Sequence, residues 1–271
     1  MKTALTIAGS DSGGGAGIQA DIKTFSALGV YATSVITAVT AQNTLGVHAA
    51  QIMEAELVRR QLEAVLSDIF PGAVKIGMLG SAANILVSAE VLASYQAKNT
   101  VLDPILASSS GFPLLPGDAV YLLKEKLFPV VDLVTPNLPE AKVITGINIS
   151  VLEDMKQAAA LIHQMGPRFV LIKGGHLPGK ATDLFYDGAN FTILEEERVK
   201  TENTHGTGCT LSSAIAAYLA QGLDPLAAVR KAKEYLTMAL KRSFKTGHGK
   251  GPVHHFYAQY NDNDKEKAPF P

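Results

Sequence analysis

Short runs rich in β-branched residues alternate along this chain with longer segments of helical pattern, and this alternation is what most limits its possible folds. Residues 3–9 precede a helical pattern at 17–28, and residues 33–41 precede another at 55–69. Strands that alternate with helices are typical of a parallel sheet covered by helices on both faces. The rhythm continues with strand patterns at 73–78, 100–103, 132–135 and 168–173 and a helical pattern at 82–96. We therefore predict an α/β fold with a mostly parallel central sheet between helices.

The carboxyl-terminal third adds a hairpin and two helices to this prediction. Residues 184–188 and 191–199 are two strand patterns that meet through the turn pair Asp187-Gly188. Helical patterns follow near 208–221 and 224–244. Because no repeat or linker interrupts the alternation, these elements are expected to complete the same domain.

Length and charge limit the class of ligand. The chain has 271 residues without a charge-dense block, which predicts one domain over 1–258 and a disordered or loosely docked tail over 259–271. Its 24 Lys and Arg nearly cancel its 25 Asp and Glu, so we expect no nucleic acid and no membrane as partner, but a small molecule. The one cysteine excludes an internal disulfide, and no apolar run is typical of a signal peptide or a membrane span. We expect the protein in the cytoplasm.

A glycine-rich loop follows the first predicted strand. It runs from Gly9 to Gly17 and lets backbone approach a ligand closely, at the end of the sheet where α/β proteins bind ligands. The loop lacks the lysine of a P-loop and the spacing of the G-x-G-x-x-G dinucleotide pattern. A flexible strand-to-helix turn explains the same residues equally well.

Oxygen-bearing side chains and a lysine follow three later strands. Asp103 precedes a proline, and Asn137 stands three residues before Glu140 in TPNLPEA. Together these oxygens are suited to a hydrated magnesium ion, whereas Asn137 and Glu140 also match a helix-capping box and Asp103 a turn. Lys173 ends a strand, where it either contacts phosphate or reaches into solvent.

The stretch HGTGCTLSSAIAAYLA contains the only cysteine. Gly206, Thr207 and Gly208 precede a helical pattern, so their N–H groups are expected to form an anion site at a helix amino terminus. Cys209 would lie in the first turn, where the helix dipole favours the thiolate. A buried, unreactive thiol is the alternative, since free cysteines are often buried.

Seven segments resemble, in order and with natural spacing, the hydroxymethylpyrimidine and phosphomethylpyrimidine kinases of thiamine biosynthesis, in the ribokinase-like superfamily. They are AGSDSGGGAGIQAD, TAVTAQNTLGV, KIGML, LDP, TPNLPEA, KGGH and HGTGCTLSSAIAA, and the resemblance covers residues 2–250. It implies a three-layer α/β/α sandwich with a mobile flap, and a homodimer. It also implies an ATP- and Mg²⁺-dependent enzyme that phosphorylates 4-amino-5-hydroxymethyl-2-methylpyrimidine to its monophosphate and then to the diphosphate.

The resemblance also implies roles for individual residues. Cys209 would be the base that faces the acceptor hydroxyl, at the position where most sugar kinases of the superfamily have an aspartate, and Gly206, Gly208 and Lys173 would complete the catalytic set. The other implied contacts are Asn137, Thr207, Gly208 and Lys173 to the nucleotide, Asp103, Asn137 and Glu140 to the metal, and Gly9, Ala16, Asp21, Gln42, Met78 and Ile105 to the pyrimidine. The Gln42 amide suits a ring nitrogen beside an exocyclic amine, although an ordinary loop glutamine remains the alternative.

One position departs from the family pattern. Ser109 stands where many relatives carry a flap lysine. Neutralisation of the second substrate's extra charge therefore needs another group, and Lys173 is a candidate.

Three other functions compete with this interpretation. A pyridoxine or pyridoxal kinase of the same fold is the nearest, and Gln42 argues against it. An acyl-transfer enzyme would use Cys209 as nucleophile with His205 or His176 as base, but it leaves the magnesium-type residues without a role. A non-catalytic sensor of a nucleotide or vitamin is the third.

Overall fold

A computed structural model describes residues 1–107, 114, 115, 117, 119–175 and 179–260. Within these residues, nine strands form one mixed sheet in the order β3-β2-β1-β4-β5-β6-β7-β8-β9. The strands are β1 Thr3–Asp11, β2 Tyr31–Asn43, β3 Gly46–Ile52, β4 Ala73–Ile76, β5 Thr100–Leu102, β6 Leu133–Val134, β7 Phe169–Gly174, β8 Ala181–Tyr186 and β9 Phe191–Glu196. Pairing is parallel from β2 to β7 and antiparallel at both edges, which confirms the mostly parallel sheet.

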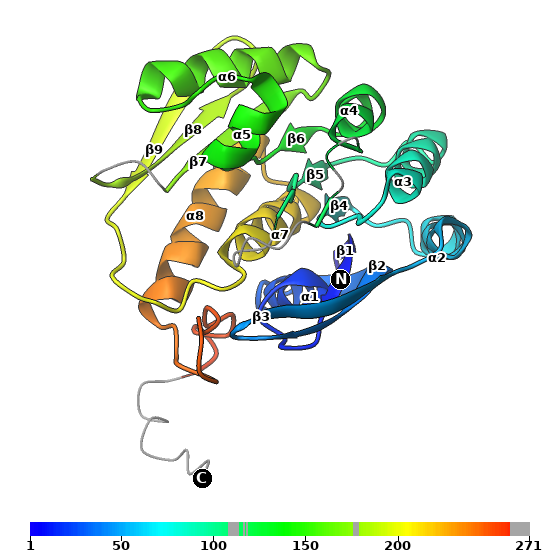
Figure 1. The fold of residues 1–271 in the computed structure, drawn as a ribbon, viewed down its shortest axis with the longest axis horizontal. Coiled ribbons are helices and arrows are strands. Elements are labelled where there is room, and N and C mark those ends of the chain that lie inside the picture. Colours follow the sequence, from blue (N-terminus) through cyan, green and yellow to red (C-terminus); the bar gives the residue numbers. More distant parts are fainter. Residues whose placement is uncertain (108–113, 116, 118, 176–178, 261–271) are drawn as a thin grey trace.

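Helices cover both faces of the sheet, as Figure 1 shows. One face carries α1 Gly17–Ala27, α7 Thr207–Ala220 and α8 Pro225–Lys241. The other carries α2 Ala55–Asp68, α3 Ala82–Ser94, α5 Leu138–Thr145 and α6 Leu152–Gln164, together with the short α4 Ala119–Leu122, which continues into a π-helical turn at Leu123–Leu127 and a 3₁₀ turn at Phe128–Val130. The predicted three-layer arrangement is therefore confirmed.

Alternate residues of the central strands pack into opposite helical layers. In β1, Leu5 and Ile7 belong to the core under α2 and α3, whereas Ala4 belongs to the core under α7 and α8. All three are fully buried, because side chains on a strand point alternately to its two faces and both faces are covered here. These nearly continuous apolar runs made the central strands predictable from the sequence.

Two irregularities of the sheet lie near each other at its carboxyl ends. The register of β1 on β2 shifts between Ala8 and Gly9, and that of β2 on β3 shifts between Ala41 and Gln42. Such bulges re-aim side chains and are common beside functional sites. The predicted hairpin is confirmed too, since Tyr186 of β8 pairs with Phe191 of β9.

Three elements were not predicted, and two predictions lie partly outside the described residues. Edge strand β3 is mostly exposed and therefore carries little apolar pattern, and helices α4 and α6 were also missed. Ser109, which the sequence places in the predicted flap, lies outside the described part of the chain. Of the predicted tail 259–271, the described part includes Gln259, whose side-chain amide donates to the carbonyl oxygen of Ala27 at 2.8 Å. The disordered or loosely docked tail stays a prediction. The single domain over 1–258 stays a prediction.

Candidate active site

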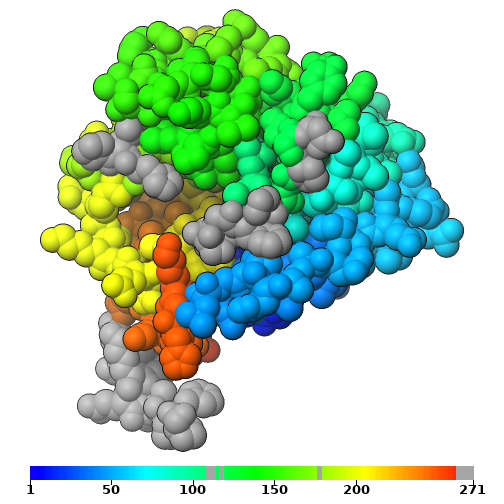
Figure 2. All heavy atoms as spheres, viewed as in Figure 1, coloured from blue at the N-terminus to red at the C-terminus, as the bar shows by residue number. Residues whose placement is uncertain are grey.

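A cavity of about 1020 Å³ lies where the carboxyl ends of the parallel strands meet the amino end of α7. Figure 2 shows a recess on this face, between the green segment around α5 and the yellow segment that follows β9. All predicted site residues except Asp21 line this cavity: Gly9, Ala16, Gln42, Met78, Asp103, Ile105, Asn137, Glu140, Lys173, Gly206, Thr207, Gly208 and Cys209. Tertiary structure thus brings residues from the whole length of the chain to one place.

Glycines shape the amino end of α7. Gly206 caps the helix with a φ of 77°, a left-handed conformation that favours glycine, and it packs directly on the carbonyl oxygen of Gly15. A Cβ on Gly208 would lie 3.2 Å from Asp103 Oδ2 and 3.5 Å from Lys173 Nζ, so glycine lets both charged groups approach the helix. The first N–H groups of the helix have no acceptor within it, which makes this end suited to bind an anion.

Cys209 lies in the first turn of α7 and is 7% exposed. Burial raises the pKa of its thiol to about 11, and the charges of Asp21 and Asp103 act in the same direction. The Lys75 ammonium and the N–H of Gly17 oppose them without prevailing. Burial therefore acts against the preference for the thiolate that the helix terminus predicts.

A lysine and two carboxyl groups form the opposite wall. Lys173 Nζ donates to Asp103 Oδ1 at 2.7 Å. Asn137 and Glu140 form the capping box of α5, in which the Asn137 N–H donates to Glu140 Oε2 at 2.8 Å and the Glu140 N–H to Asn137 Oδ1 at 2.9 Å. Burial raises the pKa of Glu140 to about 7, with Lys173 acting against it and Asp103 adding to it. Capping is therefore confirmed, and both side chains also face the cavity.

These oxygens fit a hydrated magnesium ion better than a dehydrated one. Among the described residues no group of three His, Cys, Asp or Glu side chains is arranged to hold a metal directly. Mg²⁺ usually keeps several waters and takes one or two carboxylates together with substrate phosphates. Asp103 and Glu140 supply two carboxyl groups on the cavity wall, and the raised pKa of Glu140 shows that Lys173 alone does not offset the cost of its burial. A further cation would favour the ionised carboxyl.

Gln42 and Met78 lie on the substrate side of the cavity. The Gln42 amide nitrogen is 3.4 Å from His205 Nε2, and its oxygen accepts a hydrogen bond from Thr40 at 3.3 Å. Met78 is 8% exposed, and its sulfur would lie 3.1 Å from a Cβ on Gly9, so Gly9 makes room for it. This corner combines an apolar wall with one adaptable amide, which suits a flat heteroaromatic ring.

Asp21 does not reach the cavity. Its side chain is fully buried, and both oxygens are used inside the protein. Oδ2 accepts from Thr6 Oγ1 at 2.6 Å and from Lys75 Nζ at 2.8 Å, and Oδ1 accepts from Ser213 Oγ at 2.6 Å. Because buried donors already occupy the carboxylate oxygens of Asp21, its side chain is not placed to contact a molecule in the cavity.

The sequence interpretation missed the function of Asp11. Asp11 Oδ1 accepts from the N–H of Gly13, and Oδ2 accepts from the N–H of Ala16 at 2.8 Å and lies 2.8 Å from His205 Nε2. Although burial acts in the opposite direction, these hydrogen bonds lower the pKa of Asp11. Asp11 thus fastens the glycine-rich loop to His205, the residue before Gly206. An aspartate that precedes a small polar residue and glycines is a turn signal, and this signal was available in the sequence.

His205 contacts Asp11 and Gln42, and no hydrogen bond among the described residues joins its ring to Cys209. The contacts of His205 therefore do not support the acyl-transfer alternative. Its other candidate base, His176, lies outside the described residues.

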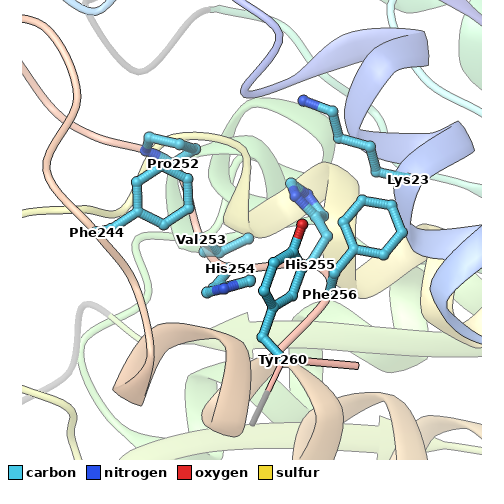
Figure 3. Close-up of a pocket in the computed structure, with 8 residues that line it drawn as sticks. All are labelled: Lys23, Phe244, Pro252, Val253, His254, His255, Phe256 and Tyr260. Carbon is cyan, nitrogen blue, oxygen red and sulfur yellow. The ribbon is translucent and has the colours of Figure 1, made fainter. Parts of the chain in front are cut away.

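Two of the polar side chains that line a second cavity, of about 290 Å³, form hydrogen bonds within the protein. Lys23, Phe244, Pro252, Val253, His254, His255, Phe256 and Tyr260 line it, as Figure 3 shows. Lys23 Nζ donates to the carbonyl oxygen of Gly14 at 2.8 Å, and His255 Nε2 lies 3.2 Å from Thr210 Oγ1. Burial lowers the pKa of His255 to about 4, so its ring is neutral near pH 7. These contacts support the glycine-rich loop and α7 from behind.

Comparison with known proteins finds relatives whose names agree with one another. The family model described as Phosphomethylpyrimidine kinase matches residues 11–254. A hydroxymethylpyrimidine/phosphomethylpyrimidine kinase of Rhizobium meliloti is 52% identical over 263 residues, which cover 96% of this chain and 98% of that protein. A thiamine biosynthesis bifunctional protein of Geobacter sulfurreducens is 50% identical over 96% of this chain, which spans 54% of that relative, about half its length.

A solved structure shares the fold. The ADP complex of Bacillus subtilis pyridoxal kinase matches with a TM-score of 0.89 and 38% identity, over 96% of this chain and all of that one. Within the described part of the chain, no helix is long and apolar enough to cross a membrane.

Proposed function

Because the chain belongs to the phosphomethylpyrimidine kinase family, we propose that its large cavity transfers a phosphoryl group from ATP to 4-amino-5-hydroxymethyl-2-methylpyrimidine, and then to the monophosphate. The protein is thus a kinase of thiamine biosynthesis. The observation that carries the proposal is the meeting of Cys209, Lys173 and Gln42 around one cavity, at the amino end of α7. This reaction needs a thiol, a cation that binds phosphate and an amide that forms hydrogen bonds with the ring.

The transferred phosphoryl group would lie against the amino end of α7. The N–H groups of Gly206 and Gly208 donate to its oxygens, and Lys173 adds a positive charge from the opposite side. The N–H of Thr207, which the sequence also placed in this anion site, donates to the carbonyl oxygen of Thr204 at 3.3 Å. Phosphoryl transfer through a loose transition state depends mainly on such positioning and charge neutralisation. Magnesium, when bound with the nucleotide, would supply further neutralisation, held through water by Asp103, Asn137 and Glu140.

The acceptor ring would lie between Met78 and the glycine-rich loop, with Ala16 and Ile105 completing the apolar contact. Gln42 donates to a ring nitrogen and accepts from the neighbouring amine. This orientation directs the hydroxymethyl group to Cys209, which accepts its proton as the new bond forms. Because burial raises the pKa of Cys209 to about 11, the thiolate that accepts this proton is the minor form near neutral pH.

Phosphorus NMR of the products tests the function. ATP, Mg²⁺ and the aminopyrimidine alcohol are expected to give first the monophosphate and then the diphosphate. Replacement of Cys209 by alanine is expected to slow the first step by about 10²–10⁴-fold and the second far less, because a phosphate acceptor is already largely ionised near neutral pH. Absence of both products would reject the proposed function, and equal losses in the two steps would reject the role of Cys209 as base.

A homodimer and a cytoplasmic location stay predictions from the sequence. Pyridoxal kinase activity is the second candidate, since the structurally similar Bacillus subtilis protein bears that name.

A further inference from the structure

Lys75 is a fully buried lysine that the sequence interpretation assigned no function. It lies on β4, one residue before Ile76, and shares the strand face of Ala73, which packs in the core beneath α7. Its side chain lines the large cavity together with Cys209. Lysines are almost never fully buried unless they are paired, so a charge in this place needs a reason.

A closed network holds the Lys75 ammonium in place. Lys75 Nζ donates to Asp21 Oδ2 at 2.8 Å, and Asp21 also accepts from Thr6 and from Ser213. A Cβ on Gly77 would lie only 2.7 Å from Lys75 Nζ, so the glycine leaves the space that the ammonium occupies. Ser213 follows Cys209 by one turn of α7, and therefore the network is anchored on the helix that carries the thiol.

We propose that Lys75 is a positioning residue that stabilises the thiolate of Cys209, and that Asp21 holds the Lys75 ammonium while weakening its effect. The use of that thiolate as a base rests on the proposed function. The electrostatic relation between the three side chains does not, because it depends only on their charges and places.

The groups that act on the charge of Cys209 come from four parts of the chain. Lys75 on β4 and Lys173 on β7 favour its thiolate, as does the N–H of Gly17 on α1. Asp21 on α1 and Asp103 after β5 oppose it.

Lys75 itself remains charged while the thiol titrates. Burial disfavours its ammonium, but the negative charges of Asp21, Cys209 and Asp103 outweigh burial and raise the pKa of Lys75. The sign of its effect on the thiol is therefore constant over the relevant pH range.

Alkylation of the thiol tests the proposal without ATP or substrate. Cys209 is the chain's one cysteine, so the pH at which the iodoacetamide reaction reaches half its maximal rate reports its ionisation directly. Lys75→Met is expected to raise this midpoint by roughly one pH unit, and Asp21→Asn to lower it by a similar amount. At a fixed pH below the midpoint, each change corresponds to about tenfold in rate, in opposite directions.

Opposite shifts distinguish electrostatics from damage to the fold, since partial unfolding would expose the thiol in both variants. Shifts of the same sign, or no shift in either variant, would overturn the proposal. If Lys75→Met does not fold because Asp21 is left buried and unpaired, the double variant Lys75→Met/Asp21→Asn replaces it. Its midpoint has to lie above that of Asp21→Asn alone, and a midpoint at or below that value would also overturn the proposal.

Lys233→Met is the matched control. It breaks another buried pair on the same cavity, in which Lys233 Nζ donates to Asp183 Oδ2, and neither partner is among the groups that shift the pKa of Cys209 most. The alkylation midpoint is expected to stay unchanged, and a shift as large as that of Lys75→Met would overturn the assignment to Lys75. Because the assay needs no turnover, failure of the NMR experiment with intact midpoint shifts would reject the kinase function and leave this inference standing.

Discussion

Two lysine–aspartate pairs approach the amino end of α7, and they differ in how completely the protein surrounds them. Lys75 and Asp21 have fully buried side chains, whereas those of Lys173 and Asp103 are 15% and 2% exposed. Both oxygens of Asp21 are engaged by Thr6, Lys75 and Ser213. Asp103 Oδ2 instead faces the narrow gap beside Gly208, and Lys173 faces the cavity.

The difference shows how one kind of ion pair serves two purposes. A buried pair with satisfied hydrogen bonds is costly to open, so Lys75–Asp21 acts as a fixed charge distribution under Cys209. The pair at the cavity wall can exchange partners when phosphate or a cation arrives, so Lys173–Asp103 is suited to turnover.

Stability should depend most on the fully buried pair, Lys75 and Asp21. Lys75→Met is expected to lower the free energy of unfolding by about 3–5 kcal/mol, because Asp21 remains as a buried charge without its partner. Denaturant titration measures this, and the double variant Lys75→Met/Asp21→Asn should recover most of the loss. A loss below about 1 kcal/mol, as at an exposed pair, would erase the contrast with Lys173.

Turnover should depend most on the pair at the cavity wall, Lys173 and Asp103. Lys173→Met is expected to lower kcat by about 10²–10³-fold, since one preorganised phosphate contact is lost, and to destabilise the protein less than Lys75→Met does. Steady-state kinetics and denaturant titration on the same variants check both parts. Lys180→Met, at an exposed ion pair with Glu195, is the control and should change neither quantity. A kcat of Lys173→Met equal to that of the wild type would show that Lys173 does not contact the transferred phosphate.

Ring preference should depend on neither pair but on Gln42. Gln42→Met is expected to narrow the ratio of kcat/KM for the aminopyrimidine alcohol over pyridoxine by roughly 5- to 150-fold, because a glutamine facing the wrong ring edge costs about 1–3 kcal/mol and methionine does not. Both alcohols are assayed at saturating ATP, with the exposed Gln51→Met as control. An unaltered ratio would show that Gln42 does not read the ring and would favour the vitamin B6 kinase alternative.

The smallest effect expected from a change of one pH unit concerns Glu140, whose pKa depends on both Lys173 and Asp103. Burial raises its pKa from 4.5 to about 7, so between these values the folded state binds more protons than the unfolded state. The contribution of Glu140 to stability is then present below about pH 4.5 and is lost as pH rises through 7, by at most about 1.4 kcal/mol per pH unit. Glu140→Gln keeps an oxygen for the capping box and removes this dependence.

Denaturant titrations in metal-free buffer across that pH range, on wild type and Glu140→Gln, measure the difference. The variant should gain stability relative to wild type as pH rises. A difference that is constant with pH would mean that the Glu140 carboxyl is ionised throughout.

Local patterns predicted much of the fold, and they failed where the tertiary environment decides. The central strands were predicted because both of their faces are covered, which makes them continuously apolar, as at Leu5 and Ile7. The exposed edge strand β3 lacks that pattern and was missed. The capping box of Asn137 and Glu140 was predicted from four residues, since both of its hydrogen bonds are local.

The sequence by itself determined the central strands, most of the helices, the glycine-rich turns and most of the candidate site residues, because these depend on periodicity, backbone freedom and the position of loops after strands. Only the tertiary structure decided the charge states. Asp21 stands 54 residues before Lys75 and 192 before Ser213, and its hydrogen bonds to both hold its side chain outside the cavity lining. Cys209 has the helix terminus that the sequence indicates, yet burial holds its pKa near 11, because desolvation depends on everything packed around the sulfur and not on its neighbours in the chain.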